Sequence, residues 1–221
     1  MERNLFLSVL VATLLLIALA MFIPGQRESD SIETLPWHIT IDGAGRSTIF
    51  GITLEQTTLA EVEQLFGSEA EISLFSSAEG GYTVEAFFNR VTLNGIKAKF
   101  VFVVGLSAQA LQQSYERGVR IATMGSGTRK VTLADSDLTR VMATAVTSLT
   151  YLPRLDLDTA LLEQRFGTPA EQIATKEGII HWLYPQQGLD IALYTEGKEV
   201  FNYVIPARFE QLRGPLLAVN P

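Results

Sequence analysis

The chain of 221 residues contains no cysteine. Disulfide bonds, thiolate metal sites, cysteine nucleophiles and the lipidated amino-terminal cysteine of a bacterial lipoprotein are therefore excluded. Only two histidines occur, His38 and His181, and neither has a second histidine or an acidic residue at the sequence spacing of metal ligands. We interpret both as ordinary strand residues and expect no metal site and no cofactor.

The chain also lacks a strong positive bias, because its formal net charge is −7. This balance argues against nucleic acid as a partner. The charge is unevenly spread: residues 26–80 carry two basic and ten acidic side chains, whereas residues 81–133 carry seven basic and two acidic ones. The basic block suits either an acidic partner or an ordinary solvated face. Its candidate binding residues are Arg117, Arg120, Arg129 and Lys130.

Motifs of catalysis are missing as well. No serine lies in a Gly-x-Ser-x-Gly elbow, and Gly125-Ser126-Gly127 lacks the spacing and the following helix of a phosphate-binding loop. We interpret this glycine-rich stretch as a hairpin turn. The pairs Asp135/Asp137 and Asp156/Asp158 precede predicted helices, where carboxylates favour the positive end of the helix dipole. The sequence therefore predicts a protein that is not an enzyme.

One long uncharged run stands at the amino terminus, from Leu5 to Ile23. As a helix it spans roughly 28 Å, close to the hydrocarbon thickness of a bilayer. Arg3 precedes the run, so the positive-inside rule predicts a single-pass inner-membrane anchor with the carboxy-terminal bulk in the periplasm. A signal peptide cleaved after Ala20 is the alternative, and both interpretations export the rest of the chain. Residues 1–25 form this anchor or signal segment, and residues 26–36 a linker.

The run Thr58–Gly67 resembles the run Asp158–Gly167, with five of ten positions identical. Each predicts a short helix that begins at an N-cap residue and ends at a glycine in the left-handed conformation. Strand-like segments follow each helix, and Asn94-Gly95 predicts a tight hairpin between two of them. The predicted fold class is α+β: an N-terminal transmembrane helix followed by two repeated helix-plus-antiparallel-meander units. Their expected bounds are residues 37–133, which include an insertion, and residues 134–221.

The order of helix, Phe-Gly, small residue and meander resembles the BLIP-like superfamily, which includes the β-lactamase inhibitor proteins and the SmpA/OmlA (BamE-like) outer-membrane lipoproteins. The residues that carry the resemblance are Val62–Gly67, Leu162–Gly167 and His181–Pro185. It covers roughly residues 48–104 and 148–205. The resemblance implies two tandem copies of a non-enzymatic module that presents a sheet to protein partners.

The leading hypothesis is an exported, membrane-anchored module of the cell envelope that binds an unidentified envelope protein. Contact would use a free sheet face together with the basic block and two aromatic residues of the last strands, Trp182 and Tyr184. The alternative is a periplasmic binder of a lipid, a glycan or another small ligand. A closed apolar cavity of several hundred Å³ would favour the alternative.

Overall fold

The computed structural model describes residues 35–219, except residues 78, 79, 126 and 196. The expected anchor or signal segment, residues 1–25, lies outside the described residues, as does nearly all of the expected linker, residues 26–36. Within the part of the chain that is described, no helix has the length and apolarity needed to cross a membrane.

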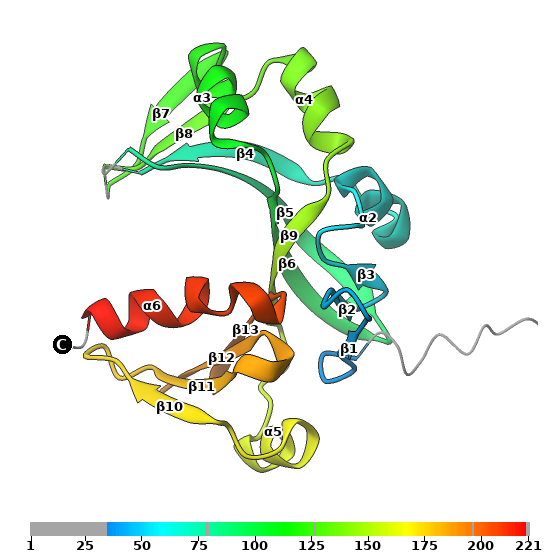
Figure 1. Cartoon of the computed structure of the whole chain (residues 1–221), viewed down its shortest axis with the longest axis vertical. Coiled ribbons are helices and arrows are strands. Elements are labelled where there is room, and N and C mark those ends of the chain that lie inside the picture. The colour runs from blue at the N-terminus through cyan, green and yellow to red at the C-terminus, as the bar shows by residue number, and fades with distance from the viewer. Residues whose placement is uncertain (1–34, 78–79, 126, 196, 220–221) are drawn as a thin grey trace, which may run out of the picture. The chain divides into compact units, whose positions relative to one another are not determined.

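Ten strands form one antiparallel sheet in the order β10-β11-β12-β13-β9-β6-β5-β4-β8-β7 (Figure 1). Their bounds in chain order are β4 Glu71–Ser76, β5 Tyr82–Leu93, β6 Ile96–Val104, β7 Arg120–Thr123, β8 Arg129–Thr132, β9 Val146–Pro153, β10 Glu171–Ala174, β11 Ile180–Tyr184, β12 Leu189–Tyr194 and β13 Lys198–Val204. A separate small sheet contains β1 Thr40–Ile41, β2 Ser47–Ile49 and β3 Ile52–Thr53.

The expected fold class, α+β with a transmembrane helix and two repeated units, is wrong. The described chain is mostly β, and a single sheet runs through both of the expected units. Strand β9 joins the two parts, because Leu149 is paired with Phe102 of β6 on one side and with Tyr203 of β13 on the other. Pairing between strands about fifty residues apart is not encoded in any local pattern, so the sequence gives no sign of it.

Several local predictions are confirmed. Helices α2 (Leu59–Phe66) and α5 (Thr159–Phe166) form where they were expected. Thr58 caps α2 in a capping box with Glu61, and Gly67 ends that helix in the left-handed conformation at φ 58°. The second helix ends differently from the prediction: Gly167 has a positive φ of 79°, but its ψ of −174° is extended rather than left-handed helical. The Asn94-Gly95 turn joins β5 to β6 as expected.

The face of the large sheet that carries Phe88, Phe100 and Phe201 is called the core face below. All three of these phenylalanines are almost fully buried. Helices α2 and α5 contact it through aromatic pairs such as Phe66–Phe100, 4.9 Å between centroids, and Phe166–Phe201, 5.9 Å. The core face therefore holds the main hydrophobic core.

Further elements lie on the same side. Helix α3 (Ala108–Glu116) follows its cap Ser107, and Tyr115 of α3 packs on Tyr82 of β5 at 4.9 Å between ring centroids. Helix α4 (Asp135–Met142) contributes the buried Val141. The turn between β2 and β3 places Phe50 at a positive φ of 57°, and its ring lies 5.4 Å from that of Phe100. This burial stabilises a backbone conformation that a bulky residue rarely adopts.

On the opposite side of the large sheet, called the second face, one helix of the described part of the chain lies against the strands. This helix, α6 (Glu210–Val219), lies along β10–β13, as Figure 1 shows in red. Two 3₁₀ turns, η1 Pro185–Gln187 and η2 Pro206–Arg208, complete the carboxy-terminal part. Helix α6 was not predicted, because Gly214 and Pro215 interrupt its apolar pattern. The missed signal is the spacing of Phe209, Leu212 and Leu216.

Candidate binding surface

One row of directly paired residues crosses eight of the ten strands on the second face. From β10 to β4 it consists of Glu171, Leu183, Asp190, Asn202, Thr150, Val101, Phe87 and Glu71. Directly paired residues of an antiparallel sheet project to the same side, so all eight belong to one surface. Each end of the row is a glutamate at the first position of its strand, Glu171 on the edge strand β10 and Glu71 on β4, and the two halves between them differ in what covers them.

In the half formed by β10–β13, called the covered half, the apolar side chains of the second face are hidden. Leu183 and Val204 are 0% and 2% exposed, although neither belongs to the core cluster on the other side of the sheet. Helix α6 accounts for this burial. Its Arg213 donates to both carboxylate oxygens of Glu171, at 2.8 and 3.4 Å, and Phe209 just before it is buried.

A chain of polar contacts runs beneath α6 in the covered half. Both carboxylate oxygens of Asp190 lie within 3.1 Å of Nδ1 of His181, and Nδ2 of Asn202 donates to Asp190 at 3.1 Å. Thr150 donates to Asn202 at 2.9 Å. No local pattern in the sequence indicates this network, because its four members come from four different strands. His181 is therefore a strand histidine whose Nδ1 is hydrogen-bonded within the sheet, and its pairing with Asp190 was not predicted.

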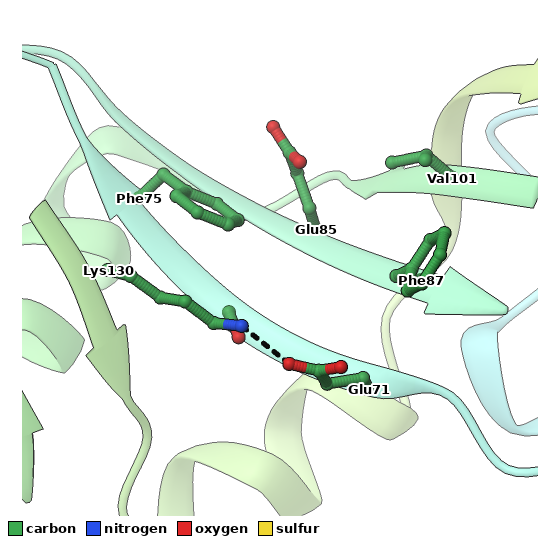
Figure 2. A pocket seen from close by; sticks show the side chains of 7 residues that line it. Glu71, Phe75, Glu85, Phe87, Val101 and Lys130 are labelled. Atoms are coloured by element: carbon green, nitrogen blue, oxygen red, sulfur yellow. Dashed lines mark hydrogen bonds and ion pairs between the residues drawn. The ribbon is translucent and has the colours of Figure 1, made fainter. Parts of the chain in front are cut away.

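In the half formed by β4–β6, called the exposed half, no helix of the described residues lies on the second face. Its side chains surround an open hollow of about 290 Å³ (Figure 2). The lining residues are Glu71, Ser73, Phe75, Glu85, Phe87 and Val101 from the three strands and Lys130 from β8. Phe75, Phe87 and Val101 are each only half-buried, unlike their counterparts beneath α6. The hollow therefore combines three half-buried apolar side chains with two carboxylates and one ammonium group.

Glu85 is the unusual polar group of the hollow. Its side chain stands between Phe75 and Phe87, pointing away from the sheet (Figure 2), and burial raises the pKa of its carboxyl. Among the described residues, no ion pair or hydrogen bond of the Glu85 side chain is found. The other acid of the hollow, Glu71, instead forms an ion pair with Lys130. Glu85 is therefore the carboxylate that remains available to a binding partner.

A second hollow of about 430 Å³ adjoins the same face and reaches toward the start of α6. Thr83 and Val103 line it from the sheet, and Arg208 and Gln211 line it from the chain around η2 and α6. Val103 is paired directly with Glu85 across β5 and β6. The two hollows therefore form one continuous surface between β4 and α6.

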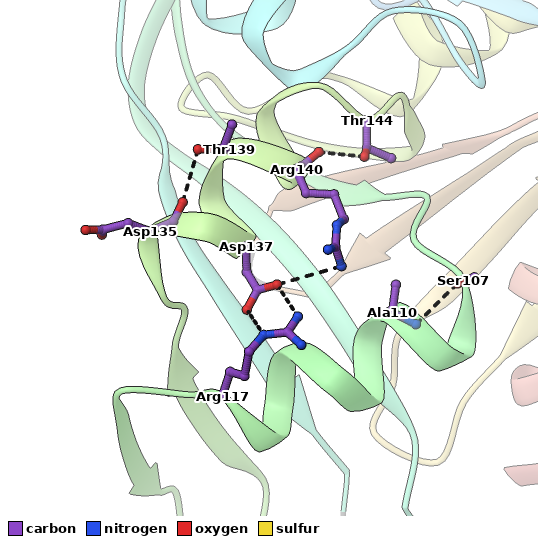
Figure 3. A network of polar contacts seen from close by, with 8 residues as sticks. All are labelled: Ser107, Ala110, Arg117, Asp135, Asp137, Thr139, Arg140 and Thr144. Atoms are coloured by element: carbon purple, nitrogen blue, oxygen red, sulfur yellow. Dashed lines mark hydrogen bonds and ion pairs between the residues drawn. The ribbon is translucent and has the colours of Figure 1, made fainter.

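The structure does not gather the four basic candidate residues into one free cluster. Arg117 forms a bidentate contact with Asp137 of α4, at 2.6 and 3.1 Å (Figure 3), and this contact lowers the pKa of Asp137. Asp137 was expected to cap α4, but it lies inside the first turn, and its carboxylate is almost completely buried.

The other three basic candidates lie apart from this contact. Arg129 donates to the hydroxyl of Tyr115, while Arg120 is exposed on β7. Only Lys130 lies in the hollow.

The two aromatic candidates, Trp182 and Tyr184, lie on the core face. Trp182 is half-buried against the core cluster. Tyr184 is buried, its hydroxyl donates to the carbonyl oxygen of Gly167 at 2.9 Å, and burial raises its pKa to about 12. Neither residue contributes to the surface on the second face. The alternating pattern of the sequence is consistent with Phe87 as an aromatic residue of a strand. Only the position of α6 in the structure shows that Phe87 is left uncovered.

No protein-family model, characterised protein or solved structure matches the chain. The resemblance to the BLIP-like superfamily therefore stays a prediction. Within residues 35–219 as described, no three histidine, aspartate or glutamate side chains are grouped in a way that suits a metal ion.

Proposed function

We propose that the chain is a non-enzymatic, protein-binding module of the cell envelope, and that it contacts its partner through the exposed half of the second face. The observation that carries the proposal is the contrast between the two halves of one surface. Beneath α6 the apolar side chains are buried, whereas Phe75, Phe87 and Val101 are left half-buried around an open hollow. A protein partner would bury these side chains as α6 buries the others.

Two features support binding of a protein over catalysis or small-ligand capture. Of the two histidines, His181 is bonded to Asp190 in the covered half and His38 precedes β1, so neither lines the hollow with Glu85. Small ligands are usually enclosed over most of their surface. This hollow lies on a sheet face, walled by strand side chains, and so offers a platform for a larger partner.

The envelope location rests on the apolar run Leu5–Ile23, which we propose directs the rest of the chain to the periplasmic side of the inner membrane.

Photo-crosslinking in intact cells tests this proposal. A benzophenone amino acid at position 87 of the full-length chain should give one discrete adduct with a partner protein. The same group at position 65, on the exposed side of α2, is the control, because Leu65 is 51% exposed and lies on the other side of the sheet. Replacing Phe75 with Asp should remove the adduct at position 87. Absence of any adduct there, or equal yields from both positions, would show that this face is not the binding surface.

A further inference from the structure

The arrangement of α6 in the covered half indicates what kind of element the exposed half accepts. Helix α6 lies on a sheet face, its apolar positions Phe209, Leu212 and Leu216 recur at helical spacing, and Arg213 beside them pairs with Glu171. A single helix with one cationic side chain therefore covers one half of the surface. The other half presents apolar side chains and an acid on the same face, and none of the helices within residues 35–219 covers it.

We infer that the exposed half of the second face binds an amphipathic helix of a partner protein, and that a cationic side chain of this helix pairs with Glu85. The inference rests on the proposed function and specifies the form and the charge of the partner.

A helix fits this surface better than an added strand does. Backbone groups in the middle of a sheet are already paired with neighbouring strands, so a partner on the face can contact only side chains. Strand β5, which carries Glu85 and Phe87, is paired on both sides, with β4 and with β6. Neighbouring strands lie about 4.8 Å apart, so three strands offer a width close to the roughly 10 Å diameter of a helix.

The charge of the helix follows from the acids of the hollow. Glu71 already has Lys130 as its partner, whereas Glu85 has no ion pair among the described residues. Burial beneath a partner helix would remove further water from the Glu85 carboxylate, which is costly unless a cation or a donor replaces that water. An arginine or a lysine supplies this group, as Arg213 does for Glu171.

The test uses the full-length chain in nanodiscs of zwitterionic lipid and a display library of helical peptides of about 16 residues, roughly 24 Å long. Each peptide has an alanine–glutamine scaffold, an apolar stripe at helical spacing and randomised positions beside the stripe. We expect selection for peptides with Arg or Lys at those positions. Glu85→Gln should weaken their binding about tenfold to a hundredfold, the range expected when a charge-assisted hydrogen bond is lost.

A charge exchange makes the assignment specific. Glu85→Arg should abolish binding of the selected peptides, and replacing their cationic residue with glutamate should restore binding to this variant. The matched control is Glu163→Gln, since Glu163 is exposed on α5 at the opposite side of the sheet and its loss should leave binding unchanged. Empty nanodiscs measure binding of the peptides to lipid alone.

Three results would overturn the inference: selection without cationic enrichment, peptides that bind Glu85→Arg as tightly as the natural chain, or a concentration-dependent dimer that Glu85→Arg dissociates. The last result would assign the surface to a second copy of the chain. If the peptides fail while crosslinking from position 87 succeeds, the helix inference is wrong and the proposed function stands. If both fail, both are wrong.

Discussion

Glu71 and Glu171 stand at opposite ends of one eight-residue row across the second face, and only Glu171 is paired with a helix. Arg213 of α6 holds Glu171, while Glu71 pairs with Lys130 of the neighbouring strand β8. The surface between them is therefore covered on one side and exposed on the other. This asymmetry defines the candidate binding surface, and it depends on how firmly α6 belongs to the fold.

The first prediction concerns the attachment of α6. Phe209 is 4% exposed, so Phe209→Ala should lower the free energy of unfolding by about 3 kcal/mol through lost burial and the cavity that remains. Leu217→Ala is the control, because Leu217 is 41% exposed and its loss should change stability by less than about 0.5 kcal/mol. Urea unfolding measures both. Equal, small effects would mean that α6 is only loosely attached and that both halves of the face are accessible.

The second prediction concerns the core face. The ring of Phe66 lies 4.9–5.9 Å from those of Phe88, Phe100 and Phe102, so Phe66→Ala should cost about 3–4 kcal/mol. Its neighbour Leu65 points to solvent, and Leu65→Ala should be nearly neutral. Denaturant titration of the two variants decides the matter. A nearly unchanged midpoint for Phe66→Ala would contradict the placement of this ring in the core.

Features that depend on residues close together in the sequence could be predicted, whereas contacts between distant segments could not. The N-cap at Thr58 and the Asn94-Gly95 turn are each encoded by residues close together in the sequence, and both were predicted correctly. The pairing of β9 with β13 joins distant segments, so two separate units were expected where one sheet exists. The exposed surface was not predicted either, because it is defined by the half of the face that α6 leaves uncovered. Helix α6 itself was not predicted, since Pro215 lies within it and proline usually ends a helix.

The third prediction concerns Glu85, whose pKa is raised by burial above its ordinary value of 4.5. A raised carboxyl pKa means that the folded chain binds this proton more tightly than the unfolded chain, so stability falls as the pH rises through the folded pKa. Glu85→Gln should therefore be more stable than the natural chain at neutral pH. The difference should vanish below about pH 4.5. Thermal melting across this pH range provides the measurement, and a destabilised Gln variant at pH 7 would show that Glu85 supports the fold.

The fourth prediction concerns the contact between α3 and α4. Arg117 pairs with the buried carboxylate of Asp137, so Arg117→Ala should destabilise the fold at neutral pH by leaving that carboxylate without its bidentate partner. Arg120→Ala, on the exposed strand β7, should be neutral. Because the pKa of Asp137 is lowered from 3.8, the stabilisation is present above that value and is lost as the pH falls through the folded pKa. Equal stability of the two variants at pH 7 would contradict this role.

The same contact changes the expectation for the basic block. Reversing Arg117, Arg120, Arg129 and Lys130 together would not leave the fold intact, because it would place a carboxylate at position 117 against the buried Asp137. Weakened capture by such a variant would therefore not distinguish lost binding from lost folding. Arg120 alone is the informative position for an acidic partner, since its side chain is exposed at the sheet edge.

We propose that a partner covers the exposed half of the second face in the cell, and the absence of cysteine from the chain allows a single introduced thiol to test this. A single thiol at Val101→Cys, in the middle of the hollow, should react with a membrane-permeant maleimide several times more slowly in intact cells than in the purified chain. A thiol at Leu65→Cys, on the solvent side of α2, should react equally fast in both. Protection of position 101 alone is the result that this account predicts. Equal reactivity of position 101 in cells and in the purified chain would contradict it.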